Sequence, residues 1–175
     1  MCDNAGGGDC GPLACEDAAA DLWPQKGFGE GVRERVVRAL ERPDVGFLLS
    51  EFCPGWKERV DMWSTPGGWV GRGFFFAFAA SIGVVETLAV VTSAGRQRGG
   101  GYTITMVREF PLKAMLERAK RGEDINDPWP PVVTRRPVTE GSVGLFDTIP
   151  VGSSTLVVAH VGNNHWAYVQ QLRDY

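Results

Sequence analysis

The sequence has no apolar run long enough to cross a membrane. Its longest apolar stretch, residues 74–91, is interrupted by Ser81, Gly83, Glu86 and Thr87, whereas a spanning helix needs about 20 consecutive, mostly apolar residues. The N-terminus also lacks the basic segment followed by an apolar segment that marks a secretory signal. We therefore expect no membrane partner and a cytoplasmic location.

Positive charge is neither abundant nor concentrated. The 18 Lys and Arg residues are outnumbered by 21 Asp and Glu residues, which gives a net charge of −3. The basic residues are scattered among the acids, whereas a nucleic-acid-binding surface normally shows a basic patch or stripe. The sequence also contains no internal repeat and no low-complexity tract. We expect no nucleic acid partner and no repeat architecture.

Histidine and cysteine are scarce, which limits metal and disulfide chemistry. The chain has two histidines and four cysteines, at Cys2, Cys10, Cys15 and Cys53. Their spacing matches no recognisable zinc site, and a chain of 175 residues forms a sizeable core without disulfides. We expect reduced thiols, no metal and no cofactor, with at most one cysteine acting chemically.

The length and composition favour one globular domain, residues 1–175, that acts as a monomer. Apolar residues recur at helical spacing through most of the first half. We expect Pro43 to end the second helix and Gly83 to end the buried fifth helix. The helices are predicted over 12–22, 32–41, 44–52, 56–63 and 69–82, and over 112–121 with a basic outer face.

β-branched and alternating residues dominate the rest of the chain. Residues 84–92 predict a central strand, and 102–107 a second one. The final strands are predicted over 155–161 and 165–172, joined by Gly162-Asn163-Asn164, whose composition is typical of a hairpin turn. Residues 127–141 are expected to form an extended surface loop. The fold class is therefore α+β, with N-terminal helices packed on a small mixed or antiparallel sheet.

One cysteine lies between a glycine-rich loop and the first turn of a helix. Cys10 follows Gly-Gly-Gly-Asp, and Pro12 suits a first helical turn because its missing N–H costs no bond there. Unpaired N–H groups and the helix dipole favour a thiolate at this position. The glycines allow the backbone to present N–H groups to an anion. A nucleophile beside an oxyanion hole is one interpretation, and a free cysteine packed under a loop is the other.

A cysteine nucleophile needs a base within hydrogen-bond reach and a group that orients this base. His160 lies inside an apolar strand and is most simply a structural residue. His165 begins the last predicted strand directly after the turn, where a rigid element meets a loop. We expect His165 to be the base, with a solvent-facing hairpin histidine as the alternative.

Three short motifs resemble those of the ovarian-tumour (OTU) domain cysteine proteases. The first is Gly8-Asp9-Cys10 at a helix start, and the last is Asn164-His165-Trp166 near the C-terminus. Between them, residues 63–68 (Trp-Ser-Thr-Pro-Gly-Gly) lead to a buried helix and a strand, similar to the tryptophan–glycine step of the family. The order of cysteine first and histidine last distinguishes this pattern from the Ulp-type proteases.

The resemblance implies a papain-related fold and a set of roles for particular residues. Cys10 would be the nucleophile, and His165 the general base and then the acid. Backbone N–H groups of Gly8, Asp9 and Cys10 would hold the oxyanion. Trp166 and Gly7 would contact the substrate, with Trp166 forming the wall of a narrow channel that accepts a glycine-glycine tail.

The chain departs from the family pattern at the third catalytic position. The family usually has an acid three residues before the cysteine, or Asp/Asn two residues after the histidine, where this chain has Gly7 and Ala167. Asn163 is the favoured orienting residue because it lies two positions before His165. Asp9, Asn164 and Asp3 are the alternatives.

The resemblance implies a deubiquitinase, a cysteine isopeptidase that removes ubiquitin or a ubiquitin-like modifier. Glu51, Glu58 and Asp61 are placed to meet a basic ubiquitin tail, although a solvated surface explains them equally well. One alternative is a viral or mobile-element protease that processes a polyprotein, which as a viral or bacterial effector would act in the host cytoplasm. The other is an inactive module that binds a modifier without cleaving it.

Overall fold

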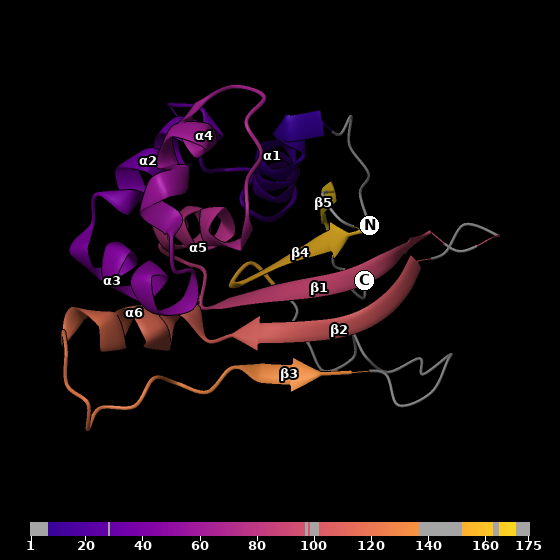
Figure 1. The fold of residues 1–175 in the computed structure, drawn as a ribbon. Coiled ribbons are helices and arrows are strands. Elements are labelled where there is room, and N and C mark those ends of the chain that lie inside the picture. Colours follow the sequence, from indigo (N-terminus) through magenta and orange to yellow (C-terminus); the bar gives the residue numbers. More distant parts are fainter. Residues whose placement is uncertain are drawn as a thin grey trace.

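The computed structural model describes residues 7–27, 29–96, 98, 102–136, 152–162 and 165–170. Helices come first along the chain and strands dominate the second half (Figure 1). The helical elements are η1 (Gly7–Asp9), α1 (Cys10–Leu22), α2 (Val32–Leu40), α3 (Pro43–Phe52), η2 (Trp56–Arg59), α4 (Val60–Ser64), α5 (Arg72–Ile82) and α6 (Leu112–Lys120). The strands are β1 (Thr87–Arg96), β2 (Tyr102–Phe110), β3 (Val133–Arg135), β4 (Thr155–Val161) and β5 (His165–Tyr168).

The five strands form one mixed sheet in the order β3-β2-β1-β4-β5. The central strand β1 pairs antiparallel with β2 and parallel with β4, and β5 pairs antiparallel with β4. The predicted central strand, the final pair of strands and the α+β class are therefore confirmed. Strand β5 is an edge strand, which leaves its outer backbone groups available to the helix beside it.

Helix α5 forms the centre of the helical layer, and its four phenylalanines are fully buried. The helix starts at Arg72 rather than at residue 69, because Gly71 is extended and Trp69 is exposed to solvent. It ends, as predicted, at Gly83, which has a φ of +81°. Side chains of Lys26, Arg35 and Arg42 donate hydrogen bonds to the last carbonyls of the helix.

The helices cover only part of one sheet face. In Figure 1 they lie over one end of β1 and β2, and the strands extend beyond them. Apolar side chains at the covered end, such as those of Leu88, Phe110 and Leu156, belong to the main core. Further along, a row of side chains crosses four strands in register: Met106, Thr92, His160 and Trp166. This row forms the floor of a pocket described below.

Helix α1 lies along the edge strand β5 and is tied to it at both ends. At its start, the backbone N–H of Trp166 donates to the Cys10 sulfur at 3.3 Å. Near its end, the Tyr168 hydroxyl donates to the Asp21 carboxylate. The helix begins at Cys10, two residues earlier than predicted, because Gly7–Asp9 form the 3-10 turn η1 instead of an irregular loop and lead directly into it. The N- and C-terminal parts of the described chain therefore meet at this edge.

Three local predictions are wrong. Helix α2 already ends at Leu40, so Pro43 is not the residue that ends it. Pro43 is instead the first residue of α3, where its missing N–H is tolerated. The expected surface loop contains β3, which pairs with β2 as an edge strand. The last strand ends at Tyr168 rather than at residue 172, and residues 171 and 172 lie outside the described part.

The predicted basic outer face of α6 is also wrong at one position. Arg118 is only 4% exposed. Its guanidinium donates to the backbone carbonyls of Gly122, Asp124 and Asp127 and lies 4.7 Å from the ring centroid of Trp129. The buried Arg118 thus holds the segment after α6 in place, and these carbonyls and the Trp129 ring satisfy its charge. Among the described helices, none is long and apolar enough to span a membrane.

Candidate active site

Cys10 is the first residue of α1, where the sulfur meets the partial positive charge of a helix N-terminus. The N–H of Trp166, 3.3 Å from the sulfur, is a second group complementary to a thiolate. Two covalent bonds separate that nitrogen from the Cα of His165, so this Cα lies within about 5.7 Å of the sulfur. The structure therefore brings the backbone of the predicted base beside the predicted nucleophile, although 155 positions separate them in the sequence.

Packing around Cys10 is dense. The residue is 1% exposed, and the indole of Trp166 donates to the Val70 carbonyl at 3.1 Å. A Cβ added to Gly11 would lie 2.1 Å from the Val70 side chain, so glycine is required for the helix to approach this segment. The predicted tryptophan wall is thus anchored on the segment before α5. Because the anchor and the thiol share one packed cluster, the sulfur position is fixed by the surrounding side chains.

The other described cysteines have a different environment. Burial raises the pKa of the Cys15 thiol well above its usual range, and the nearby Glu16 carboxylate adds to this effect. Burial also raises the pKa of Cys53, against the opposing influence of Arg72. Both residues therefore remain protonated thiols near neutral pH, which makes them poor nucleophiles. Cys2 lies outside the described residues.

Arg33 of α2 holds the turn that precedes Cys10. Its guanidinium donates to the Gly8 carbonyl at 3.2 Å, to the Asp9 carboxylate at 2.9 Å and to the Gly68 carbonyl at 2.8 Å. A further bond reaches the carbonyl of Trp63 at 2.8 Å. One side chain therefore joins the predicted oxyanion turn to the segment of residues 63–68. This role could not be predicted from the sequence, because α2 carries several arginines and only the tertiary fold brings one of them to the turn.

The geometry of the turn also depends on Gly8. A Cβ at this position would lie 1.7 Å from the Gly67 carbonyl oxygen, which no side chain can accept without movement of the backbone. The Gly67 N–H in turn donates to the Asp9 carboxylate at 2.8 Å. The predicted oxyanion residues Gly8 and Asp9 therefore lie in close backbone contact with the 63–68 segment.

The Asp9 carboxylate accepts hydrogen bonds from Arg33 and from the Gly67 N–H. These bonds explain its position without a role in orienting a histidine. Its hydrogen bond to Arg33, and then that to Gly67, lower the pKa of the carboxyl below its ordinary value of 3.8. A lowered pKa stabilises the folded state above the unfolded pKa, and this stabilisation disappears as the pH falls through the folded pKa.

We predict that Asp9→Asn destabilises the protein at pH 7 and has little effect near pH 2. The carboxylate that accepts from Arg33 exists only above the lowered pKa, so the difference between the two proteins should shrink below about pH 3.8. Denaturant midpoints measured at both pH values test this expectation. An equal destabilisation at the two pH values would mean that the charge of Asp9 does not matter.

The third catalytic position stays a prediction. Asn163, the favoured orienting residue, lies outside the described residues, as do the alternatives Asn164 and Asp3. Gly7 lies in η1, three positions before Cys10. Ala167, at the other position where the family carries a polar group, is buried in β5 and offers no side-chain acceptor.

A pocket of about 350 Å³ lies beside Trp166. Its floor includes the row of Thr92, Met106 and His160, and its rim includes the exposed Trp69. His160 stacks on Trp166 with ring centroids 4.5 Å apart. Two arginines complete the lining, Arg72 and Arg108. The apolar strand around His160 predicted a structural role and did not indicate the pocket, because the pocket exists only where four strands lie side by side in register.

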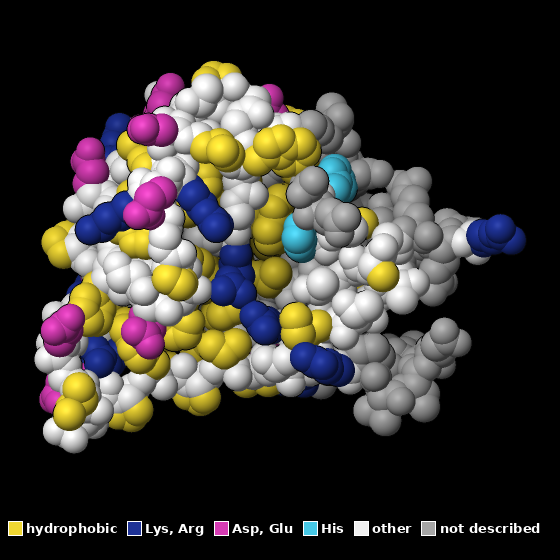
Figure 2. Space-filling model, in the orientation of Figure 1, with side chains coloured by type: hydrophobic (Ala, Val, Ile, Leu, Met, Phe, Trp, Pro, Cys, Tyr) yellow, Lys and Arg dark blue, Asp and Glu magenta, His cyan; other side chains and the backbone are white. Residues whose placement is uncertain are grey.

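Figure 2 shows the face that carries this pocket. Both histidines of the chain are visible there, and Lys and Arg side chains lie next to them among hydrophobic side chains. Both histidines and several basic side chains therefore lie on one face of the molecule.

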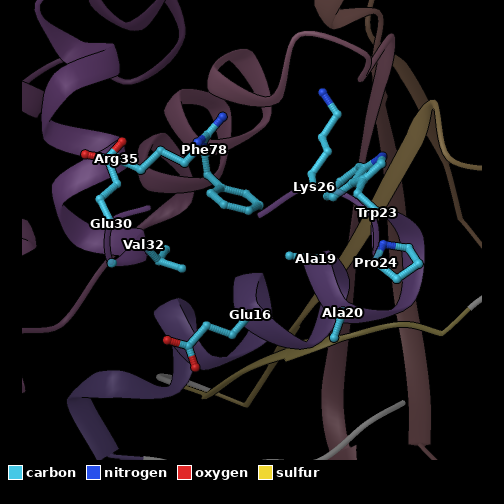
Figure 3. Close-up of a pocket in the computed structure, with 11 residues that line it drawn as sticks. Glu16, Ala19, Ala20, Trp23, Pro24, Lys26, Glu30, Val32, Arg35 and Phe78 are labelled. Carbon is cyan, nitrogen blue, oxygen red and sulfur yellow. The ribbon is translucent and has the colours of Figure 1, made fainter. Parts of the chain in front are cut away.

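A second cavity, of about 270 Å³, lies between α1 and α2 (Figure 3). Glu16, Ala19 and Ala20 of α1 lie across it from Arg35 and Phe78. Glu16 is six positions along the helix from Cys10, a rise of about 9 Å. The basic side chains at this cavity, those of Lys26 and Arg35, already donate hydrogen bonds to the last carbonyls of α5. We therefore place the candidate active site at the pocket beside Trp166.

The described residues contain no group of three or more His, Cys, Asp or Glu side chains arranged to hold a metal ion. No protein-family model, no curated protein and no solved structure matches the chain. The class of protein is therefore inferred from the chemistry of the site.

Proposed function

We propose that the protein is a cysteine peptidase in which Cys10 is the nucleophile and His165 the general base. More specifically, we propose an OTU-like isopeptidase of the cytoplasm that releases ubiquitin or a ubiquitin-like modifier. The observation that carries the proposal is the 3.3 Å hydrogen bond from the Trp166 N–H to the Cys10 sulfur. It brings a thiol at a helix N-terminus beside the strand end that bears the predicted base, and this proximity supports a nucleophile–base pair of the kind that cysteine catalysis uses.

The reaction would proceed through an acyl-enzyme. The Cys10 thiolate attacks the carbonyl carbon of the terminal glycine and forms a tetrahedral oxyanion. The C–N bond then breaks as the imidazolium of His165 gives its proton to the leaving lysine amine, and a thioester remains. His165 next removes a proton from water, the resulting hydroxide attacks the thioester, and the thiol leaves with the modifier released as a carboxylate.

The turn before Cys10 supports stabilisation of the oxyanion. The backbone N–H groups of Gly8, Asp9 and Cys10 belong to the turn that Arg33 and Gly67 hold in place. A donor fixed before the reaction stabilises developing charge without reorganisation. Arg33 is therefore a positioning residue in this proposal.

Isopeptide cleavage by matched cysteine variants tests the proposal. We predict that Cys10→Ala cleaves lysine-linked ubiquitin dimers and ubiquitin-like fusions at no measurable rate, because the pKa values of the other described cysteines, Cys15 and Cys53, are raised and these thiols stay protonated. Cys53→Ala serves as the control and should keep turnover within a few-fold of the parent protein. Gel-based cleavage assays across several linkages give the readout. Equal cleavage by the Cys10→Ala variant would refute the proposed mechanism.

A second candidate function is processing of a polyprotein by a protease of the same fold. Arg72 and Arg108 favour it, because they line the pocket beside the nucleophile and would repel a basic ubiquitin tail. The candidate acids for such a tail, Glu51, Glu58 and Asp61, are exposed on α3, η2 and α4 and do not line this pocket. Cleavage of a precursor with no action on ubiquitin would identify this function, and binding without cleavage would identify an inactive module.

A further inference from the structure

The pocket beside Trp166 combines an aromatic side with a basic side. The aromatic side consists of His160, Trp166 and the rim residue Trp69, which is 46% exposed. The basic side consists of Arg72, at the start of α5, and Arg108, on β2. The apolar floor residue Val90 pairs with Arg108 in the β1–β2 register, so the arginine rises directly beside the floor.

The two arginines have unused hydrogen-bonding capacity. Arg72 donates through Nη2 to the Phe52 carbonyl at 2.9 Å and lies over the Phe110 ring. Its Nε is buried without a hydrogen-bond partner, the one such side-chain atom among the described residues. Within the described part of the chain, neither Arg72 nor Arg108 forms an ion pair with a carboxylate.

Buried and half-buried guanidinium groups are normally satisfied by carboxylates or carbonyls. Glu109, the neighbour of Arg108 in the sequence, does not supply one, because it is buried and paired with Arg135 at 3.0 Å. Among the described residues, no acceptor is found for the buried Arg72 Nε, and no carboxylate pairs with Arg108. Trp166 lines this pocket and its N–H contacts Cys10, so a polypeptide bound next to the proposed nucleophile is the source of an acceptor that we favour.

We propose that this pocket binds an acidic side chain of the substrate polypeptide, in the segment next to the scissile bond. The inference rests on the proposed peptidase function in its second form, the processing of a polyprotein, and specifies the substrate class of that form. A Glu or Asp carboxylate would accept hydrogen bonds from Arg72 and Arg108, while the peptide backbone lies along Trp69 and Trp166. Guanidinium groups recognise carboxylates with good geometry and strength. A basic tail is disfavoured at the same position by like charge.

A peptide series with one varied position tests the proposal. The probes are internally quenched octapeptides of alanine with a central Gly-Gly, in which Glu, Gln or Lys occupies each of three positions on either side in turn. Cleavage is measured with the parent protein, and binding is measured by calorimetry with the Cys10→Ala variant. Calorimetry keeps the charge preference measurable even where no cleavage occurs.

We expect Glu at one position to bind about tenfold more tightly than Gln, since a hydrogen bond to a charged group is worth about this factor. Arg108→Gln should abolish the preference, and Arg108→Glu should reverse it in favour of Lys. Arg38→Gln on α2, whose side chain is 72% exposed and pairs with Glu30, is the matched control and should change nothing. Circular dichroism melting verifies that the variants fold.

The outcomes separate the two proposals. Cleavage by the parent protein without any preference for Glu, or with a preference that Arg108→Gln leaves intact, overturns the acidic-substrate inference and leaves the peptidase function in place. Preference for Glu in binding, with no cleavage of any peptide or ubiquitin conjugate, supports the pocket assignment and contradicts the enzymatic function. Displacement of the peptides by a short single-stranded oligonucleotide, with no preference for Glu, would assign the arginines to phosphates instead.

Discussion

Replacement of His165 with Gln should lower the turnover of an isopeptide substrate by about 10²–10⁴-fold, the range expected when a general acid-base group is removed. Glutamine keeps hydrogen-bonding capacity but cannot carry a proton between the thiol and the leaving amine. The backbone N–H of Trp166 that contacts Cys10 is unaffected by this change, so the thiol stays in position. Steady-state kinetics with ubiquitin conjugates or a cleavable peptide measure the effect.

The second histidine provides a matched comparison. His160 stacks on Trp166 and lines the pocket, without adjoining the residue whose N–H contacts the sulfur. We expect His160→Gln to change KM more than kcat, since it alters a binding surface. A loss of kcat in His160→Gln as large as that in His165→Gln would indicate that the base is His160 or that both changes act through Trp166.

Gly8→Ala should reduce activity about 100-fold and stability by about 1–3 kcal/mol, because its Cβ would lie 1.7 Å from the Gly67 carbonyl oxygen. The turn must move by an ångström or more to relieve this contact. Such a displacement separates the backbone donors of residues 8–10 from the position of the oxyanion. Kinetics and chemical denaturation of the same preparation report the two effects.

Gly27→Ala is the control for this substitution, since nothing lies within 4 Å of its added Cβ. It should leave activity and the denaturation midpoint close to those of the parent protein. If Gly8→Ala loses stability but retains full turnover, the turn has a structural role only and the oxyanion assignment is wrong.

Local signals in the sequence were sufficient for much of the fold. The helical period of α1 and α2, the left-handed Gly83 at the end of α5 and the turn residues between β4 and β5 each act within a few positions of the chain. In the structure, Val161 pairs with His165 at the ends of the last two strands. These features need no knowledge of distant contacts, which is why their bounds lie close to those observed.

Features that depend on distant contacts could not be predicted in the same way. Arg118 looks like any other basic residue on a helix surface, and only the fold places carbonyls of residues 122–127 and Trp129 around it. Strand β3 is three residues long and exists because β2 offers an edge. Arg33 and the pocket arginines likewise acquire their roles from tertiary neighbours.

The positions of the two catalytic candidates in the candidate site were predicted, but the contacts of the residues around them were not. The sequence placed Cys10 at a helix start and His165 at a strand start, and both positions agree with the structure. It did not indicate that Trp166 would contact both the cysteine and the Val70 carbonyl. That contact requires an edge strand beside α1, which follows from sheet order rather than from any local pattern.

The most direct measurement is the mapping of a covalent adduct. The parent protein is incubated with ubiquitin, or a ubiquitin-like modifier, that carries a thiol-reactive electrophile in place of its terminal carboxylate, and the product is digested and sequenced by mass spectrometry. We predict one adduct, on Cys10, which is lost in Cys10→Ala and forms at a much lower rate in His165→Gln. An adduct on Cys15 or Cys53, or equal rates with and without His165, would contradict the pairing of these two residues.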